Sequence, residues 1–286
     1  MNAETGGQQT AAAKRLNPLN DYLFLKIMGE KGDEEQLLSF LNAVLGRAGD
    51  LALASIEIIE ARALSADIIG NKSSVLDVRA RSADDALVNI EVQIRNLGNM
   101  DRRSLFYWSW EYSKQLESGQ DYRALPNVIA INIVNFEFLR SKDFHTCFHL
   151  WEDTERELLL TDALEIHFVD MVKFRRLGEK DVRNDPLHRW LAYFDPNSPK
   201  DLIEEIMKMD AAIQKAQERL AFVAGDKEAL REYHLREMAL SDWASGVNHA
   251  RREGRAEGRK EGAKELLDLL AQGKTIEEAR RILNLE

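Results

Sequence analysis

The chain is poor in features that mark secreted or membrane proteins. It has one cysteine, Cys147, so no intrachain disulfide can form, and this suits a reducing compartment. No apolar run approaches the roughly 20 residues of a membrane-spanning helix. Residues 1–13 are small and polar and lack the apolar centre of a signal peptide. We therefore expect a cytoplasmic protein with no membrane partner.

The chain also lacks an excess of positive charge. The chain has 39 Lys and Arg against 49 Asp and Glu, which gives a net charge of −10. This balance argues against a protein that coats nucleic acid electrostatically. It leaves room for a nuclease, which needs only a local basic track. No phosphate-cradling glycine loop and no Ser-His-Asp pattern stands out in the sequence.

Two short runs of branched apolar residues, at 75–79 and 88–93, each carry an acid. Side chains alternate along a strand, so a hairpin centred near Asp84 would set Asp77 directly across from Glu91, with Cβ atoms roughly 5 Å apart. Two carboxylates that close repel each other unless one is protonated or a cation lies between them. Mg²⁺ favours such ligands. The hairpin therefore indicates a metal site for phosphoryl chemistry, and the alternative is the exposed half of an amphipathic hairpin.

The remaining pattern predicts a mixed α/β domain followed by helices. Helices are expected at 17–27, 34–45 and 101–117, and strands at 53–62, 128–134, 144–151 and 164–169. Prolines bracket a turn at 195–199, and the chain from residue 200 is charged and helical, with single helices expected at 202–223 and from 227 past 243. We expect a disordered tip at 1–15, the main domain at 16–199 and a helical extension at 200–286.

Glycine recurs at every fourth position within 253–262, which keeps the glycines on nearly one helical face. Each glycine costs a helix about 1 kcal/mol relative to alanine. A self-association helix would compensate for this cost through close contact. A flexible basic arm near nucleic acid and a solvated charged helix are the alternatives. Beyond this segment, residues 275–278 form a capping-box pattern that opens a last helix.

The acidic hairpin resembles the hallmark of the PD-(D/E)XK nuclease superfamily, an Asp on one strand and Glu-x-Lys on the next, with Gln93 in place of the Lys. The amino-acid sequence of the hairpin is similar to that of the Rpn family of recombination-promoting nucleases and transposases, in which Glu-x-Gln is usual. Further similar features are the segments 20–26 and 37–42, Arg103, Tyr107, Gly119, Asp121, Tyr122 and the Glu-Gly-Arg repeat. The resemblance implies an α/β fold, with a restriction-endonuclease-like mixed-sheet core and a C-terminal all-helical extension.

The resemblance also implies a divalent-metal-dependent DNA endonuclease of recombination or mobile elements, and we expect a homodimer. Asp77 and Glu91 would bind Mg²⁺ or Mn²⁺, and Asp21 is a candidate third ligand or a first-turn helix acid. Gln93 would orient the attacking water without bringing charge, or it is merely structural. A catalytically weak or inactive DNA-binding or protein-interaction module derived from such a nuclease is the alternative function.

Candidate contacts to nucleic acid are Lys72, Arg79, Arg103 and Tyr107. Arg103 and Tyr107 share a helix face, and we expect phosphate contact for the first and packing for the second. His145, Cys147 and His149 would face the same way on a strand, which superficially suggests Zn²⁺. A structural zinc normally takes four ligands, and neighbours on one strand are too collinear to surround an ion. We therefore expect an ordinary packed or surface strand there.

Overall fold

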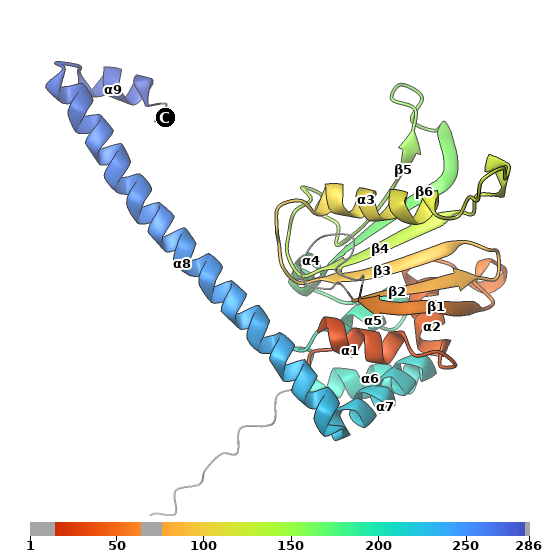
Figure 1. Cartoon of the computed structure of the whole chain (residues 1–286). Coiled ribbons are helices and arrows are strands. Elements are labelled where there is room, and N and C mark those ends of the chain that lie inside the picture. Colours follow the sequence, from red (N-terminus) through yellow and green to blue (C-terminus); the bar gives the residue numbers. More distant parts are fainter. Residues whose placement is uncertain (1–14, 64–75, 284–286) are drawn as a thin grey trace, which may run out of the picture. The chain divides into compact units, whose positions relative to one another are not determined.

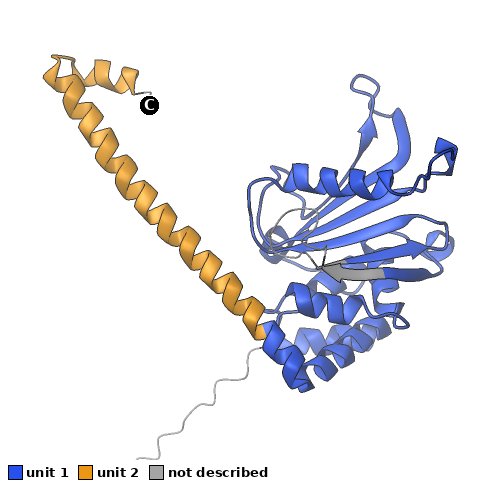
Figure 2. Cartoon of the chain, viewed as in Figure 1, with its two compact units in different colours: residues 1–233 blue, residues 234–286 orange. Residues whose placement is uncertain are grey.

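A computed structural model describes residues 15–63 and 76–283 of the chain. The chain divides into two compact units, residues 1–233 and 234–286 (Figure 2). Its helices are α1 (Asp21–Met28), α2 (Glu35–Val44), α3 (Met100–Ser113), α4 (Met171–Arg176), α5 (Pro186–Phe194), α6 (Lys200–Met209), α7 (Ala211–Gly225), α8 (Lys227–Ala271) and α9 (Ile276–Ile282), with short 3₁₀ turns at Gly49–Leu51 and Tyr122–Ala124. Its strands are β1 (Ile56–Ala63), β2 (Leu76–Ser82), β3 (Leu87–Gln93), β4 (Val128–Val134), β5 (His145–Trp151) and β6 (Leu159–Asp170).

The six strands form one mixed sheet in the order β1-β2-β3-β4-β6-β5 (Figure 1). β4 pairs in parallel with β3 and β6, and the other pairs are antiparallel. All seven residues of β4 are buried, as expected of a central strand that is covered on both faces. The α/β fold class is confirmed, including the restriction-endonuclease-like mixed sheet and the helical C-terminal extension.

One face of the sheet packs against helices α1, α2, α5, α6 and α7, which lie on the same side of it in Figure 1. This main core joins sheet residues such as Val88 and Ile90 to a cluster of aromatic rings. Phe40 is at its centre, with its ring centroid 5.9 Å from that of Trp190 and 5.3 Å from that of Phe194. The burial of this apolar face holds the acidic hairpin in place.

The opposite face is covered by α3, which presents an unusual set of residues to the sheet (Figure 1). The buried positions of this helix are Met100, Ser104, Tyr107 and Glu111, and they recur at helical spacing. Most carry polar groups, so the layer between α3 and the sheet is partly polar. Trp108 anchors the helix by donating from Nε1 to the carbonyl of Val128 at 2.8 Å.

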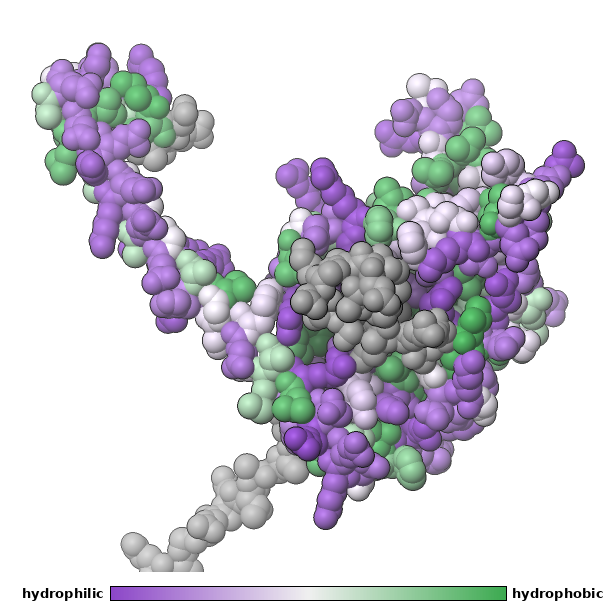
Figure 3. Space-filling model, in the orientation of Figure 1, coloured by the Kyte–Doolittle hydropathy of each residue, from purple (hydrophilic) through white to green (hydrophobic). Residues whose placement is uncertain are grey.

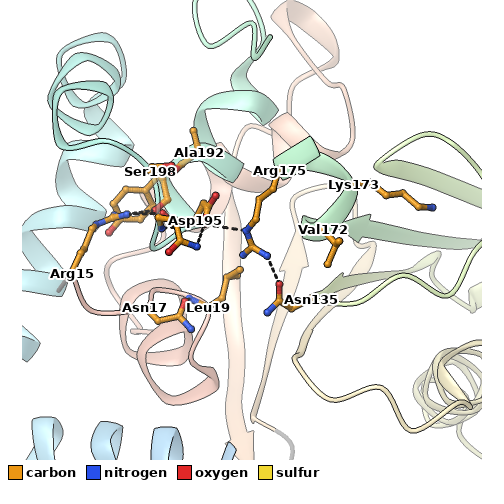
Figure 4. Close-up of polar contacts among 12 residues, drawn as sticks. Arg15, Asn17, Leu19, Asn135, Val172, Lys173, Arg175, Ala192, Asp195 and Ser198 are labelled. Carbon is orange, nitrogen blue, oxygen red and sulfur yellow. Dashed lines mark hydrogen bonds and ion pairs between the residues drawn. The ribbon is translucent and has the colours of Figure 1, made fainter. Parts of the chain in front are cut away.

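A polar network joins the end of β4 to α4, α5 and the first described residues (Figure 4). Arg175 donates from Nε to Asp195 at 3.1 Å and from Nη1 to Asn135 at 2.5 Å. Arg15 donates to the carbonyls of Tyr193 and Asp195 at 2.8 and 3.2 Å. These bonds connect residues far apart in the sequence to the end of α5.

The sequence analysis does not predict α5. The start of this helix nevertheless has a recognisable sequence signal, because Pro186 is its first residue and follows the N-cap Asp185.

The helix expected over 202–223 is two helices. The chain breaks at Asp210, whose side chain accepts from the backbone N–H groups of Ala212 and Ile213 and caps α7. Both helices belong to the first unit, where Ile206 and Ile213 are fully buried in the main core. The compact units divide after residue 233. The domain division after residue 199, which the change in composition predicts, stays a prediction.

In the second unit α8 runs on to Ala271, and α9 follows a turn. The predicted capping box is confirmed, with the Thr275 hydroxyl and the Glu278 side chain bonded to each other's backbone N–H. Most of α8 is hydrophilic (Figure 3). Exposed apolar side chains occur near its end and on α9, among them Leu267, Ile276 and Ile282. Among the described residues, no helix combines the length and apolarity that crossing a membrane requires.

Candidate active site

The acidic hairpin forms in the expected register. β2 and β3 are antiparallel, and Asp77 is the partner of Glu91. The turn between them depends on Asp85, which takes a left-handed φ of 66°, and on a bond from the Ser82 N–H to the Ala86 carbonyl at 2.9 Å. Asp tolerates this conformation better than most residues. The backbone of Asp77 is described, and its side chain lies outside the described part of the structure.

Glu91 is almost completely buried, with 1% of its surface exposed. Arg103, on α3, holds its carboxylate, with Nε 2.8 Å and Nη2 2.6 Å from Oε1. Burial raises the pKa of Glu91, and the charge and hydrogen bonds of Arg103 oppose that rise. A buried carboxylate therefore faces a positive charge at the place where the sequence predicts a cation.

Asn132 on β4 is the neighbour of Glu91 in the sheet and is also buried. Its side chain accepts from the Ser104 hydroxyl at 2.8 Å and donates to the carbonyl of His167 at 3.1 Å. These contacts fix α3 over the strand beside Glu91. Our sequence reasoning missed Asn132, although an amide within the apolar run 128–134 is a recognisable signal because a buried amide needs partners.

Arg79 lies on β2, and its guanidinium forms an ion pair with Glu111 on α3. The side chain of Glu111 is only 6% exposed. Arg81 extends the same row by donating to Gln115 at 3.1 Å. Together with Glu91, Arg103 and Asn132, these residues make up what we term the polar layer between α3 and the sheet. A contact of Arg79 with nucleic acid stays a prediction.

Gln93 and Tyr107 are two further predicted site residues on β3 and α3. Gln93 is half-buried, and its Nε2 donates to the carbonyl of Arg95 at 2.9 Å. The carbonyl can only accept, so this bond fixes which end of the amide is the nitrogen. Tyr107 is buried, as expected for a packing role, and the guanidinium carbon of Arg103 lies 5.0 Å from its ring centroid.

The other predicted site residues are less closely connected. Asp21 is in the first turn of α1, a helix that packs on the opposite face of the sheet from α3, and its Oδ1 accepts from the N–H of Tyr22 at 2.8 Å. Lys72 lies outside the described residues. The structure therefore brings together Glu91, Arg103 and Tyr107, and the parts assigned to Asp21 and Lys72 stay predictions.

The family model for PD-(D/E)XK nuclease family transposases matches residues 18–250. The chain belongs to this family. The match spans the whole sheet, the polar layer and the first part of α8. Neither a curated protein nor a solved structure matches the chain. Membership supports a nuclease-like function with DNA as the substrate, and nucleases of this family generally use divalent metals.

Proposed function

We propose that this protein is a divalent-metal-dependent endonuclease that hydrolyses phosphodiester bonds in DNA, with Mg²⁺ or Mn²⁺ as its cofactor and a role in recombination or mobile elements. The observation that carries the proposal is the register of β2 and β3, which sets Asp77 opposite the buried Glu91. Membership of a nuclease family supports the interpretation of this pair of acids as metal ligands.

Asp77 and Glu91 are the proposed metal ligands, with Asp21 as a third. Oxygen ligands of this kind suit a hard divalent cation. When bound, such a cation lowers the pKa of a coordinated water and neutralises charge on the phosphate. Gln93 would hold the water through its amide oxygen, because its Nε2 is already bonded to the carbonyl of Arg95. The amide supplies orientation and no charge.

Arg103 is proposed to act in two stages. Without the cation, its guanidinium neutralises Glu91, which would otherwise be a buried charge without compensation. With a cation bound to Glu91, the guanidinium would contact the substrate phosphate, a group that arginine recognises well. Lys72, Arg79 and Tyr107 are the further proposed contacts of the nucleic acid. This local track would operate despite the net charge of −10.

The test is a plasmid-nicking assay with Mg²⁺, Mn²⁺ or EDTA. We expect wild-type protein to nick only with a divalent cation, and Asp77→Asn and Glu91→Gln each to abolish nicking while circular dichroism stays unchanged. Asp162→Asn, on an exposed position of β6, is the matched control and should behave as wild type. Wild-type nicking by either folded hairpin variant would refute the assignment.

The second candidate is a nuclease-derived DNA-binding or protein-interaction module with weak or no cleavage. The ion pair between Arg103 and Glu91 favours this module, because the guanidinium already neutralises the carboxylate that a metal ion would need as a ligand. The same assay separates the two functions. DNA retention without nicking in either metal would establish the module and exclude the endonuclease.

A further inference from the structure

A second group of titratable side chains lies on the other face of the sheet, at its β5 edge. β5 contributes His145, Cys147 and His149, and β6 contributes Glu165 and His167. His167 is the strand neighbour of Ile131, a residue of the main core, whereas Glu91 is the neighbour of Asn132 and faces α3. The two groups are therefore separate sites on opposite faces.

Three of these side chains bring their ligand atoms together. The sulfur of Cys147 is 3.3 Å from His149 Nε2 and 4.0 Å from Glu165 Oε1, and the three ligand atoms all lie within 4.8 Å of one another. Bonds of about 2.0–2.3 Å to a tetrahedral zinc put its ligands roughly 3.3–3.6 Å apart. Small side-chain adjustments would bring the three atoms to that spacing.

The imidazole of His149 is already oriented for a metal. Its Nδ1 lies 3.2 Å from the carbonyl oxygen of Leu164, which can only accept, so Nδ1 carries the proton. Nε2 then has the lone pair, and this is the nitrogen that faces Cys147. Histidine ligands in metal sites usually donate their second nitrogen to such a carbonyl or carboxylate.

Glu165 is held in a similar way by the row of histidines behind it. His167, only 3% exposed, has Nε2 2.6 Å from Glu165 Oε1 and Nδ1 2.9 Å from His145 Nε2. The carboxylate can only accept the Nε2 proton, so Nδ1 accepts in turn from His145. This chain of bonds fixes the carboxylate beside Cys147 and His149.

We propose that Cys147, His149 and Glu165 bind one divalent transition-metal ion of the zinc class, with His167 as a positioning residue for Glu165. One sulfur, one nitrogen and one oxygen suit Zn²⁺ and disfavour Mg²⁺, which takes oxygen ligands. Cys147 is exposed, so water completes the coordination from the solvent side. Binding converts the thiol to a thiolate and releases its proton to solvent.

The sequence alone predicts an ordinary packed or surface strand here, because it does not show which residues of a neighbouring strand lie beside Cys147 and His149. Cys147 and His149 alone are nearly collinear, as argued from the sequence. β6 supplies the acid from beside them, and the pairing of β5 with β6 shifts register between Phe148 and Leu150, next to His149. The spacing of Glu165 and His167, two residues apart on a strand, repeats that of Cys147 and His149.

The test is a titration of the full-length, reduced protein with Co²⁺ as a spectroscopic substitute for Zn²⁺. Cys147 is the only cysteine, so a sulfur-to-cobalt charge-transfer band reports this site alone. We expect the band to saturate at one equivalent, and Zn²⁺ but not Mg²⁺ to remove it. Cys147→Ser should abolish it. His149→Ala and Glu165→Gln should each weaken Co²⁺ binding at least tenfold, and His167→Ala by about 10–100-fold.

Two controls separate this site from the nuclease centre. Glu91→Gln, on the other face of the sheet, should keep the full cobalt band, and so should His249→Ala, which removes an exposed histidine of α8. Folding of each variant is checked by circular dichroism, and Cys147→Ser changes only an exposed side chain. The absence of a charge-transfer band in the wild type, or an unchanged Zn²⁺ stoichiometry in folded Cys147→Ser, would overturn the proposal.

Discussion

Arg103 on α3 holds Glu91 on β3 through two nitrogens that share one carboxylate oxygen, at 2.6 and 2.8 Å. Both side chains are largely buried, at 18% and 2% exposed. Removing one partner of such a pair leaves the other charge uncompensated. In this protein the charge left behind would be an acid that we propose as a metal ligand, so stability and metal binding become linked.

Arg103→Met should therefore show a metal-dependent defect. In EDTA we expect its free energy of unfolding to fall by about 3–5 kcal/mol, because Glu91 loses its counter-charge. Mg²⁺ should raise the melting temperature of the variant more than that of the wild type, since the cation replaces the lost charge. Arg123→Met, at a side chain that is 93% exposed, is the control. Equal Mg²⁺ shifts in variant and wild type would contradict the linkage.

Burial of Glu91 also predicts a pH dependence. Its pKa in the folded protein is above the usual value of 4.5, so the folded state binds this proton more tightly than the unfolded state does. Its contribution to stability is complete below the unfolded pKa and is lost as pH rises through the folded one. In EDTA, the stability of the wild type relative to Glu91→Gln should therefore fall over that interval. Urea unfolding at a series of pH values measures this difference, and a rise would show that Arg103 outweighs burial.

The sequence predicted the parts of the site that depend on neighbouring residues. The hairpin register follows from alternation and from a short turn, and both are local. The partners of Glu91 were not predictable in this way. Nothing in the helical pattern of α3 shows which strand residue Arg103 meets, so the sequence predicts only a phosphate contact for it. For Asn132 the sequence predicts only a place in a buried strand.

The same limit applies to the main core. The run 202–223 has one helical period throughout, and only the packing of the chain shows that Asp210 ends one helix and caps the next. The segment 186–194 is too short for its apolar pattern to identify a helix. The contact of its Trp190 with Phe40 of α2 shows which face of the helix is buried. Tertiary contacts decide such elements more than intrinsic propensity does.

Gln93→Ala tests the water-orienting role. If its amide oxygen holds the attacking water, single-turnover cleavage at saturating metal should slow by about a hundredfold or more, equivalent to roughly 2.7–4 kcal/mol, while metal affinity changes little. Gln115→Ala, an amide of the polar layer bonded to Arg81, is the matched control and should keep its rate. An unchanged rate in Gln93→Ala would remove Gln93 from the mechanism. Gln93→Lys introduces the commoner superfamily residue: the rate holds or rises if the pocket accepts an ammonium group, and falls if the pocket is shaped around a neutral amide.

The last prediction concerns the glycine-rich arm. Among the described residues, the main core extends along the chain as far as Tyr233, whose hydroxyl accepts from the backbone N–H of Asn17 at 3.3 Å. A chain ending at Ser245 keeps these contacts and the whole polar layer, so the α/β core should fold with an unchanged near-ultraviolet spectrum and bind the catalytic cation normally in calorimetry. It lacks the glycines of 253–262, which we expect to form a self-association surface. Either light scattering should then give a monomer mass where the full chain gives a dimer, or, if the arm contacts nucleic acid instead, DNA retention should weaken. Loss of the folded core on truncation would show that the arm belongs to the nuclease domain itself.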